Sequence, residues 1–112
     1  MVGLREGGTM EELIRYIKIL VAGELDRANK QYQPFFNTTH EAYAVTLEEL
    51  EEVEQEVFQL RDWVRCAWEY IKGDDDCNVE VAFTNAETHA IHAAAEMIQV
   101  AAMARKARIK ED

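Results

Sequence analysis

Tyr43-Ala-Val-Thr-Leu-Glu-Glu-Leu-Glu-Glu-Val-Glu-Gln-Glu-Val57 decides the fold, because apolar residues recur every third or fourth place among six glutamates. The pattern continues on the C-terminal side and comprises Tyr43, Leu47, Leu50, Val53, Val57, Leu60, Val64, Ala67 and Ile71. Alternating spacings of four and three place side chains on one side of an α-helix. We therefore predict a long helix here with one continuous buried seam.

The glutamates of this helix separate into groups when about 100° of rotation is allowed for each residue. Glu48 points away from the seam. Three others share one flank of it: Glu49, Glu52 and Glu56. Val45 and Trp63 lie on the same flank at its two ends, so we expect a neighbouring helix to cover this row in part. Covered carboxylates are protonated, paired with cations or bound to metal.

Three threonines, each followed three residues later by a glutamate, have the spacing of a capping box and predict helix starts. These pairs are Thr9 with Glu12, Thr38 with Glu41, and Thr84 with Glu87. Pro34 is expected to end the first helix and Gly73 the second. The second is long for one globular helix, so we expect a kink or a break near residues 59–62. The last helix is expected to run to about Ile109.

These boundaries predict an all-α fold, a bundle of three to four antiparallel helices. Residues 1–8 are rich in glycine and are expected to form a disordered tail, followed by a single helical domain over residues 9–112. Short helical hairpins need partners to build a closed cleft, so we expect a homo-oligomer, either a dimer or a tetramer.

The charge and the cysteines limit the classes of function. The formal net charge is −10, from 12 basic and 22 acidic residues, which argues against nucleic acid as a partner because binding phosphates needs clustered Lys and Arg. The apolar run from Leu13 to Ala22 is too short to span a bilayer, so no membrane association is expected. Cys66 and Cys77 have neither metal-ligand spacing nor a disulfide framework, so we expect free thiols in a reducing cytoplasm and a cytoplasmic protein.

The last predicted helix is apolar on nearly all sides between residues 90 and 104. Its polar residues fall within a band roughly 80° wide. They are His89, His92, Glu96 and Gln99. This narrow polar stripe is expected to face the row of three glutamates across a cleft. Together the two features indicate a metal site.

The segment Glu48-Glu-Leu-Glu-Glu52 has the form EExxE and resembles the MazG-like all-α nucleoside triphosphate pyrophosphohydrolases. The segments at residues 34–45 and 98–104 are similar to small phage and prophage members of this superfamily. The family motif continues as ExxD on a later helix, and the resemblance covers roughly residues 24–57 and 87–104. It implies Mg²⁺, with Mn²⁺ as an alternative, held by Glu49, Glu52 and Glu96. Gln99 stands where the family has its Asp, so it would coordinate through an amide oxygen at lower affinity.

In that family the metal holds a nucleoside triphosphate while water attacks and pyrophosphate leaves. Glu48 or Glu56 is then a candidate to accept the proton of the water, and the sequence does not choose between them. His89 and His92 are candidates to contact the base or a phosphate. Lys106, in the basic last turn, is a candidate to reach a phosphate, although that turn also complements the helix dipole.

Two other functions are also compatible with the sequence. The first is a non-catalytic helical assembly protein of phage or mobile-element origin, which keeps the fold after losing one metal ligand at Gln99. The second is a di-metal bundle of the ferritin type, which needs Glu-x-x-His pairs on two helices. No Glu-x-x-His occurs in the sequence, so this class ranks last.

Overall fold

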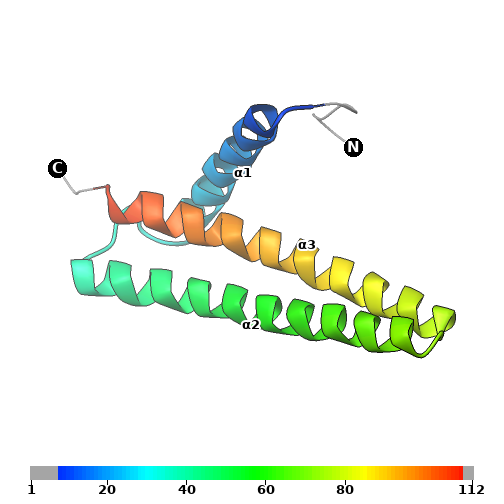
Figure 1. Ribbon diagram of the computed structural model, residues 1–112. Coiled ribbons are helices and arrows are strands. Elements are labelled where there is room, and N and C mark those ends of the chain that lie inside the picture. Colours follow the sequence, from blue (N-terminus) through cyan, green and yellow to red (C-terminus); the bar gives the residue numbers. More distant parts are fainter. Residues whose placement is uncertain (1–7, 110–112) are drawn as a thin grey trace. The chain divides into compact units, whose positions relative to one another are not determined.

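The computed structural model describes residues 8–109, and within that range the chain forms three α-helices and no strands (Figure 1). They are α1 (Met10–Gln31), α2 (Thr39–Lys72) and α3 (Asp76–Ala107). The predicted all-α class is therefore confirmed. The predicted tail lies outside the described residues except for Gly8. Among the helices described, none is long and apolar enough to cross a membrane.

Helix α1 begins and ends where local chemistry predicts. The Thr9 hydroxyl oxygen accepts a hydrogen bond of 3.1 Å from the Glu12 amide, which confirms the first predicted helix start. At the other end the Tyr32 amide donates to the Ala28 carbonyl oxygen at 2.9 Å, and the backbone then becomes extended. The helix thus ends ahead of Pro34, whose ring disfavours helical backbone at the preceding residue.

Helix α2 is continuous over 34 residues. The Thr38 hydroxyl oxygen accepts from the Glu41 amide at 3.0 Å, while a Glu41 carboxylate oxygen accepts from the Asn37 amide at 3.0 Å. No break interrupts α2 near residues 59–62, so the break expected there is not present. Sharp kinks usually occur at proline, at glycine or at an inserted turn, and α2 contains neither proline nor glycine.

The predicted start of the last helix at Thr84 is wrong, because α3 begins at Asp76. The Asn78 amide donates to the Asp75 side chain at 3.2 Å, so this aspartate provides the cap. Thr84 lies inside the helix, where its hydroxyl donates to the Glu80 carbonyl oxygen at 2.9 Å. The aspartate-rich loop therefore contains a stronger start signal than the later Thr-Glu pair.

The turn between α2 and α3 confirms the predicted stop at Gly73, but the left-handed residue is the next one. The Gly73 amide donates to the Glu69 carbonyl oxygen at 3.2 Å. Asp74 has a φ of 55°, a conformation in which a side chain is disfavoured and which glycine adopts freely.

The helices fall into two compact units. The first unit contains α1, the connection to α2, the start of α2 up to Thr46, and α3 from Ile98 onward. Its core packs Val21 and Leu25 of α1 against Ala102 of α3. The single domain expected over residues 9–112 would comprise both units, and it stays a prediction.

The second unit, here called the hairpin unit, contains residues 47–97, in which α2 and α3 lie side by side (Figure 1). Its buried apolar side chains are small: Val53 and Ala67 on α2, and Ala82 and Ala86 on α3. Small side chains allow two helix backbones to approach closely, because interiors are packed without voids.

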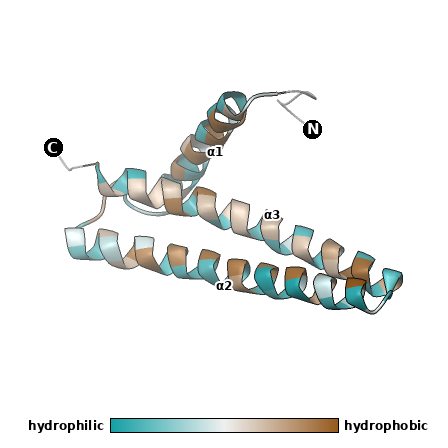
Figure 2. Cartoon of the chain, viewed as in Figure 1, coloured by the Kyte–Doolittle hydropathy of each residue, from teal (hydrophilic) through white to brown (hydrophobic). Residues whose placement is uncertain are grey.

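The predicted buried seam of α2 is wrong in part. Val53 and Ala67 are buried, but most of its other members are exposed: Tyr43, Leu47, Leu50, Val57, Val64 and Ile71. Apolar residues nevertheless recur along the whole length of α2 (Figure 2). The face that packs on α3 is rotated by roughly 70° toward the glutamate flank, given 3.6 residues per turn. This rotation turns Glu49 and Glu56 inward, where both are half-buried.

The turn generates a stability prediction. Asp74→Gly should raise the free energy of unfolding by about 0.5 kcal/mol, because glycine adopts positive φ without a steric penalty. Urea unfolding followed by circular dichroism measures the change. Gly73→Ala is the matched control: a Cβ there meets only the Glu69 and Tyr70 carbonyl oxygens, at 3.7 and 3.8 Å, and should be tolerated. A destabilised Asp74→Gly variant would contradict this account of the turn.

Candidate metal centre

Three carboxylates from two helices of the hairpin unit converge. Glu49 and Glu52 lie one turn apart on α2, and Glu96 lies on α3. One carboxylate oxygen from each lies within 4.8 Å of the other two. The predicted glutamate row and one member of the predicted polar stripe therefore face each other, although they are 44 residues or more apart in sequence. Three carboxylate oxygens are ligands that Mg²⁺ or Mn²⁺ accepts, so the chemistry of this group suits a hard divalent cation.

The surroundings of Glu96 disfavour its negative charge. Its pKa is raised, first because the Glu52 side chain is close enough to share a proton through a hydrogen bond, and next because burial removes water. The negative charges of Glu52, Glu49 and Glu56 raise it further. The Oε2 atom of Glu96 is covered and has no hydrogen-bond partner among the described residues. The three carboxylates therefore favour the binding of either a proton or a cation.

A histidine–glutamate hydrogen bond joins α2 and α3 close to this group. His89 Nδ1 donates to Glu56 Oε2 at 2.7 Å, and the two side chains are only 20% and 25% exposed. The His92 ring meets the His89 ring edge to face, with centroids 6.5 Å apart, but His92 itself is exposed. The structure thus pairs Glu56, a candidate proton acceptor, with His89, a candidate substrate contact.

Three other predicted site residues are not among these carboxylates. Glu48 is exposed on α2 and is not part of the carboxylate group. Gln99 is half-buried on α3, one turn beyond Glu96, and belongs to the first unit. Lys106 also belongs to the first unit and is only 5% exposed, and its ammonium group lies 4.8 Å from the centre of the Phe36 ring. Its neighbour is therefore an aromatic face, which attracts a cation.

Sequence reasoning missed the His89–Glu56 pair, although a signal was present. Glu49 and Glu56 are seven residues apart on α2, and His89 and Glu96 are seven apart on α3. Seven residues are close to two helical turns, so each pair lies on one face of its helix. The two helices run antiparallel, so the earlier residue of the pair on α2 lies opposite the later residue of the pair on α3. Equal spacing on both helices therefore predicts two contacts, Glu49 with Glu96 and Glu56 with His89.

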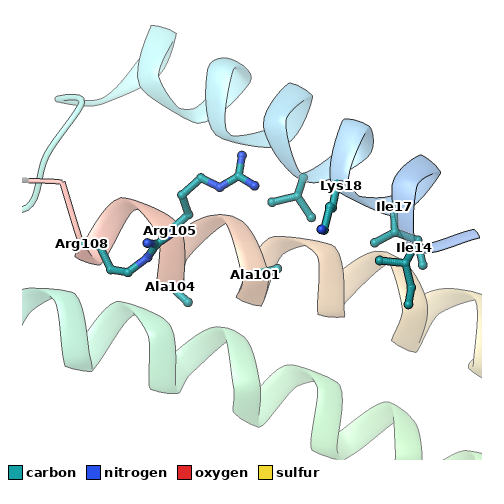
Figure 3. A pocket seen from close by; sticks show the side chains of 8 residues that line it. Ile14, Ile17, Lys18, Ala101, Ala104, Arg105 and Arg108 are labelled. Atoms are coloured by element: carbon teal, nitrogen blue, oxygen red, sulfur yellow. The ribbon is translucent and has the colours of Figure 1, made fainter. Parts of the chain in front are cut away.

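A separate hollow of about 460 Å³ lies in the first unit, between α1 and the end of α3 (Figure 3). Ile14 and Ile17 line it from α1, together with Lys18. Arg105 and Arg108 line it from α3, and the Arg105 side chain extends toward α1 (Figure 3). Lys106 of the same basic turn does not line this hollow, and its predicted phosphate contact stays a prediction.

Comparisons with known proteins give no relative from which a role could be transferred: no protein-family model matches the chain, and no curated protein or solved structure is significantly similar.

The raised pKa of Glu96 predicts a pH effect on the metal-free protein. A carboxyl whose folded-state pKa lies above its ordinary value of 4.5 stabilises the fold below that value, and the contribution is lost as the pH rises through the raised pKa. The difference in stability between Glu96→Gln and the unchanged protein should therefore shift in favour of the variant when the pH is raised from 4.5 to 8. The expected gain is on the order of 0.5 kcal/mol, or roughly 2–4 °C in melting temperature.

Thermal melts at both pH values in the presence of a chelator measure this difference. The comparison with the unchanged protein removes the contribution of all other titrating groups. A Glu96→Gln variant that is equally destabilised at both pH values would show that the three carboxylates do not repel one another in the folded state.

The His89–Glu56 bond predicts a second stability effect. His89→Leu should lower the free energy of unfolding by about 1 kcal/mol, because a half-buried hydrogen bond between two helices is lost. His92→Leu, three residues away and exposed, is the matched control and should change stability by less than about 0.5 kcal/mol. Urea unfolding compares the two. Equal effects of both substitutions would argue against a specific role for the bond.

Proposed function

We propose that the protein is a Mg²⁺-dependent nucleoside triphosphate pyrophosphohydrolase, with Mn²⁺ as an alternative metal. The observation that supports this function is the convergence of Glu49, Glu52 and Glu96 within 4.8 Å. These are the residues that the resemblance to MazG-like enzymes assigns as ligands, and they come from two different helices. If the glutamates of α2 served only as a solvated face, their charge would repel a carboxylate on α3 and not bring it close.

In this proposal the three glutamates hold the cation and so position the triphosphate of the substrate. When bound, Mg²⁺ supplies positive charge that polarises the phosphoryl oxygens. Glu49 and Glu52 are fixed by one turn of the same helix, and Glu96 closes the group from α3. Because their mutual repulsion is relieved by a cation, the same carboxylates that destabilise the metal-free protein favour the loaded one.

Glu56 is the better of the two candidate proton acceptors. Its carboxylate is half-buried beside the three ligands, and His89 holds one oxygen at 2.7 Å. A carboxylate has further acceptor sites beyond one hydrogen bond, so it remains able to take a proton from an attacking water. His89 would then act as a positioning residue that fixes the orientation of Glu56. Glu48, which is exposed and outside the group, has no such support.

A second candidate function is the non-catalytic helical assembly protein. Gln99 favours it, because this residue replaces the Asp that the family uses as a further charged ligand. The many apolar side chains exposed on α2 also suit a protein whose main role is to associate. The proposed homo-oligomer is common to both functions, so the oligomeric state does not separate them.

The test is pyrophosphate release from a panel of canonical and modified nucleoside triphosphates with Mg²⁺ or Mn²⁺. Glu49→Ala, Glu52→Ala and Glu96→Ala should each lower turnover on the order of 100-fold or more, because each removes a ligand rather than a supporting contact. Glu87→Ala, an exposed glutamate on α3, is the matched control and should leave turnover unchanged.

Metal binding is measured in parallel as the rise in melting temperature on adding Mg²⁺. The rise should occur in the unchanged protein and disappear in Glu49→Ala. A folded protein that hydrolyses none of the nucleotides and shows no rise would favour the assembly role. A rise without turnover would keep the metal site and reject the enzymatic function.

A further inference from the structure

Helix α2 has a seven-residue repeat on a face that α3 does not cover. Leu50, Val57, Val64 and Ile71 follow one another at intervals of seven. A second series lies between them at the same interval, namely Leu47, Glu54, Arg61 and Trp68. We call these eight residues the outer stripe. All eight are exposed, and all belong to the hairpin unit.

The spacing within the outer stripe is that of a two-helix coiled coil. Steps of three and four residues alternate from Leu47 to Ile71, so the two series correspond to the a and d positions of a heptad. At 1.5 Å per residue the outer stripe is about 36 Å long. An apolar face of this length on one helix is typical of an interaction surface.

We propose that the outer stripe pairs with the same stripe of a second copy of this chain, with the two α2 helices antiparallel. In that orientation apolar residues meet apolar residues at both ends of the stripe, and the charged residues lie in its middle layers. In antiparallel coiled coils an a residue packs against a d residue of the other helix. Leu47 then meets Ile71 of the partner subunit, and Leu50 meets Trp68 of the partner subunit.

The two charged residues of the outer stripe decide the orientation. In a parallel pair, Glu54 lies opposite Glu54 and Arg61 opposite Arg61, so like charges meet within the seam. In the antiparallel pair, Glu54 lies one layer from Arg61 of the partner subunit, and the two copies form this contact twice. Charged residues at core positions of coiled coils commonly fix orientation in this way, because like charges brought together out of water cost several kcal/mol, on the order of 2–5.

The flank beside the outer stripe agrees with the antiparallel orientation. Phe58, which is 66% exposed, lies near the middle of the stripe and would meet its own copy close to the two-fold axis. Glu51 and Arg65 each lie seven residues from Phe58, on opposite sides of it, so Glu51 would face Arg65 of the partner subunit. Arg65 has only a weak competing contact, a 3.4 Å ion pair with the exposed Asp62.

The proposed pairing leaves the candidate metal centre accessible. Glu49 and Glu56 lie on the face of α2 that packs against α3, whereas the outer stripe lies on a different face. The interface therefore does not rest on the proposed catalytic function. Loss of pairing and loss of metal binding are expected to be separate effects of separate substitutions.

The test is the oligomeric state in sedimentation equilibrium, at 50 mM and 500 mM salt, with helix content checked by circular dichroism. The unchanged chain should associate in pairs. Glu54→Arg and Arg61→Glu should each raise the dissociation constant at low salt by at least about 10-fold, since each brings like charges together. The double variant Glu54→Arg/Arg61→Glu should restore association, because the antiparallel pair again joins opposite charges.

Glu80→Arg, the same charge change at an exposed position of α3, is the control and should associate like the unchanged chain. A monomeric unchanged chain overturns the proposal, as do single charge reversals that have no effect. Association that weakens in the single variants but is not restored in the double variant overturns the antiparallel orientation and with it the proposed interface.

Discussion

The close contact between α2 and α3 is the constraint on which the rest of the hairpin unit depends. Its buried side chains are mainly alanine, so the two helix backbones approach closely. Close approach at a fixed register brings Glu96 to the glutamates of α2 and His89 to Glu56. A larger residue at Ala82 or Ala86 would separate the helices and with them both contacts.

This contact has an electrostatic cost. Glu49, Glu52 and Glu96 converge in a chain that already has a formal net charge of −10, and the pKa of Glu96 is raised as a result. A fold selected for stability alone would not place three carboxylates together beside a helix interface. A cation reverses the sign of the interaction, because the charges that repel one another in the metal-free protein attract the ion. The stability cost and the proposed function therefore have the same cause.

The hairpin unit has more apolar surface than one chain covers. Helix α2 uses one face to pack on α3 and exposes a second apolar face in the outer stripe. Two faces on one helix explain why its apolar pattern is so wide and why a single seam does not describe it. In the proposed pair each α2 would have α3 on one side and the partner subunit on the other. Both the catalytic and the assembly function are compatible with that arrangement.

The sequence by itself determined the helical class, the starts at Thr9 and Thr38 and the stop at Gly73, because these depend on contacts within four residues. The helical periodicity placed the glutamate row of α2 opposite the polar stripe of α3, and the resemblance to MazG-like enzymes selected Glu49, Glu52 and Glu96 from them. Only the tertiary structure decided which face of α2 is buried, since an apolar pattern does not tell which neighbour covers which part of it. The same holds for Lys106 and Phe36, which are far apart in sequence. For His89 and Glu56 the equal spacings on the two helices permit a contact, but the register in which the helices pack brings the two side chains to 2.7 Å.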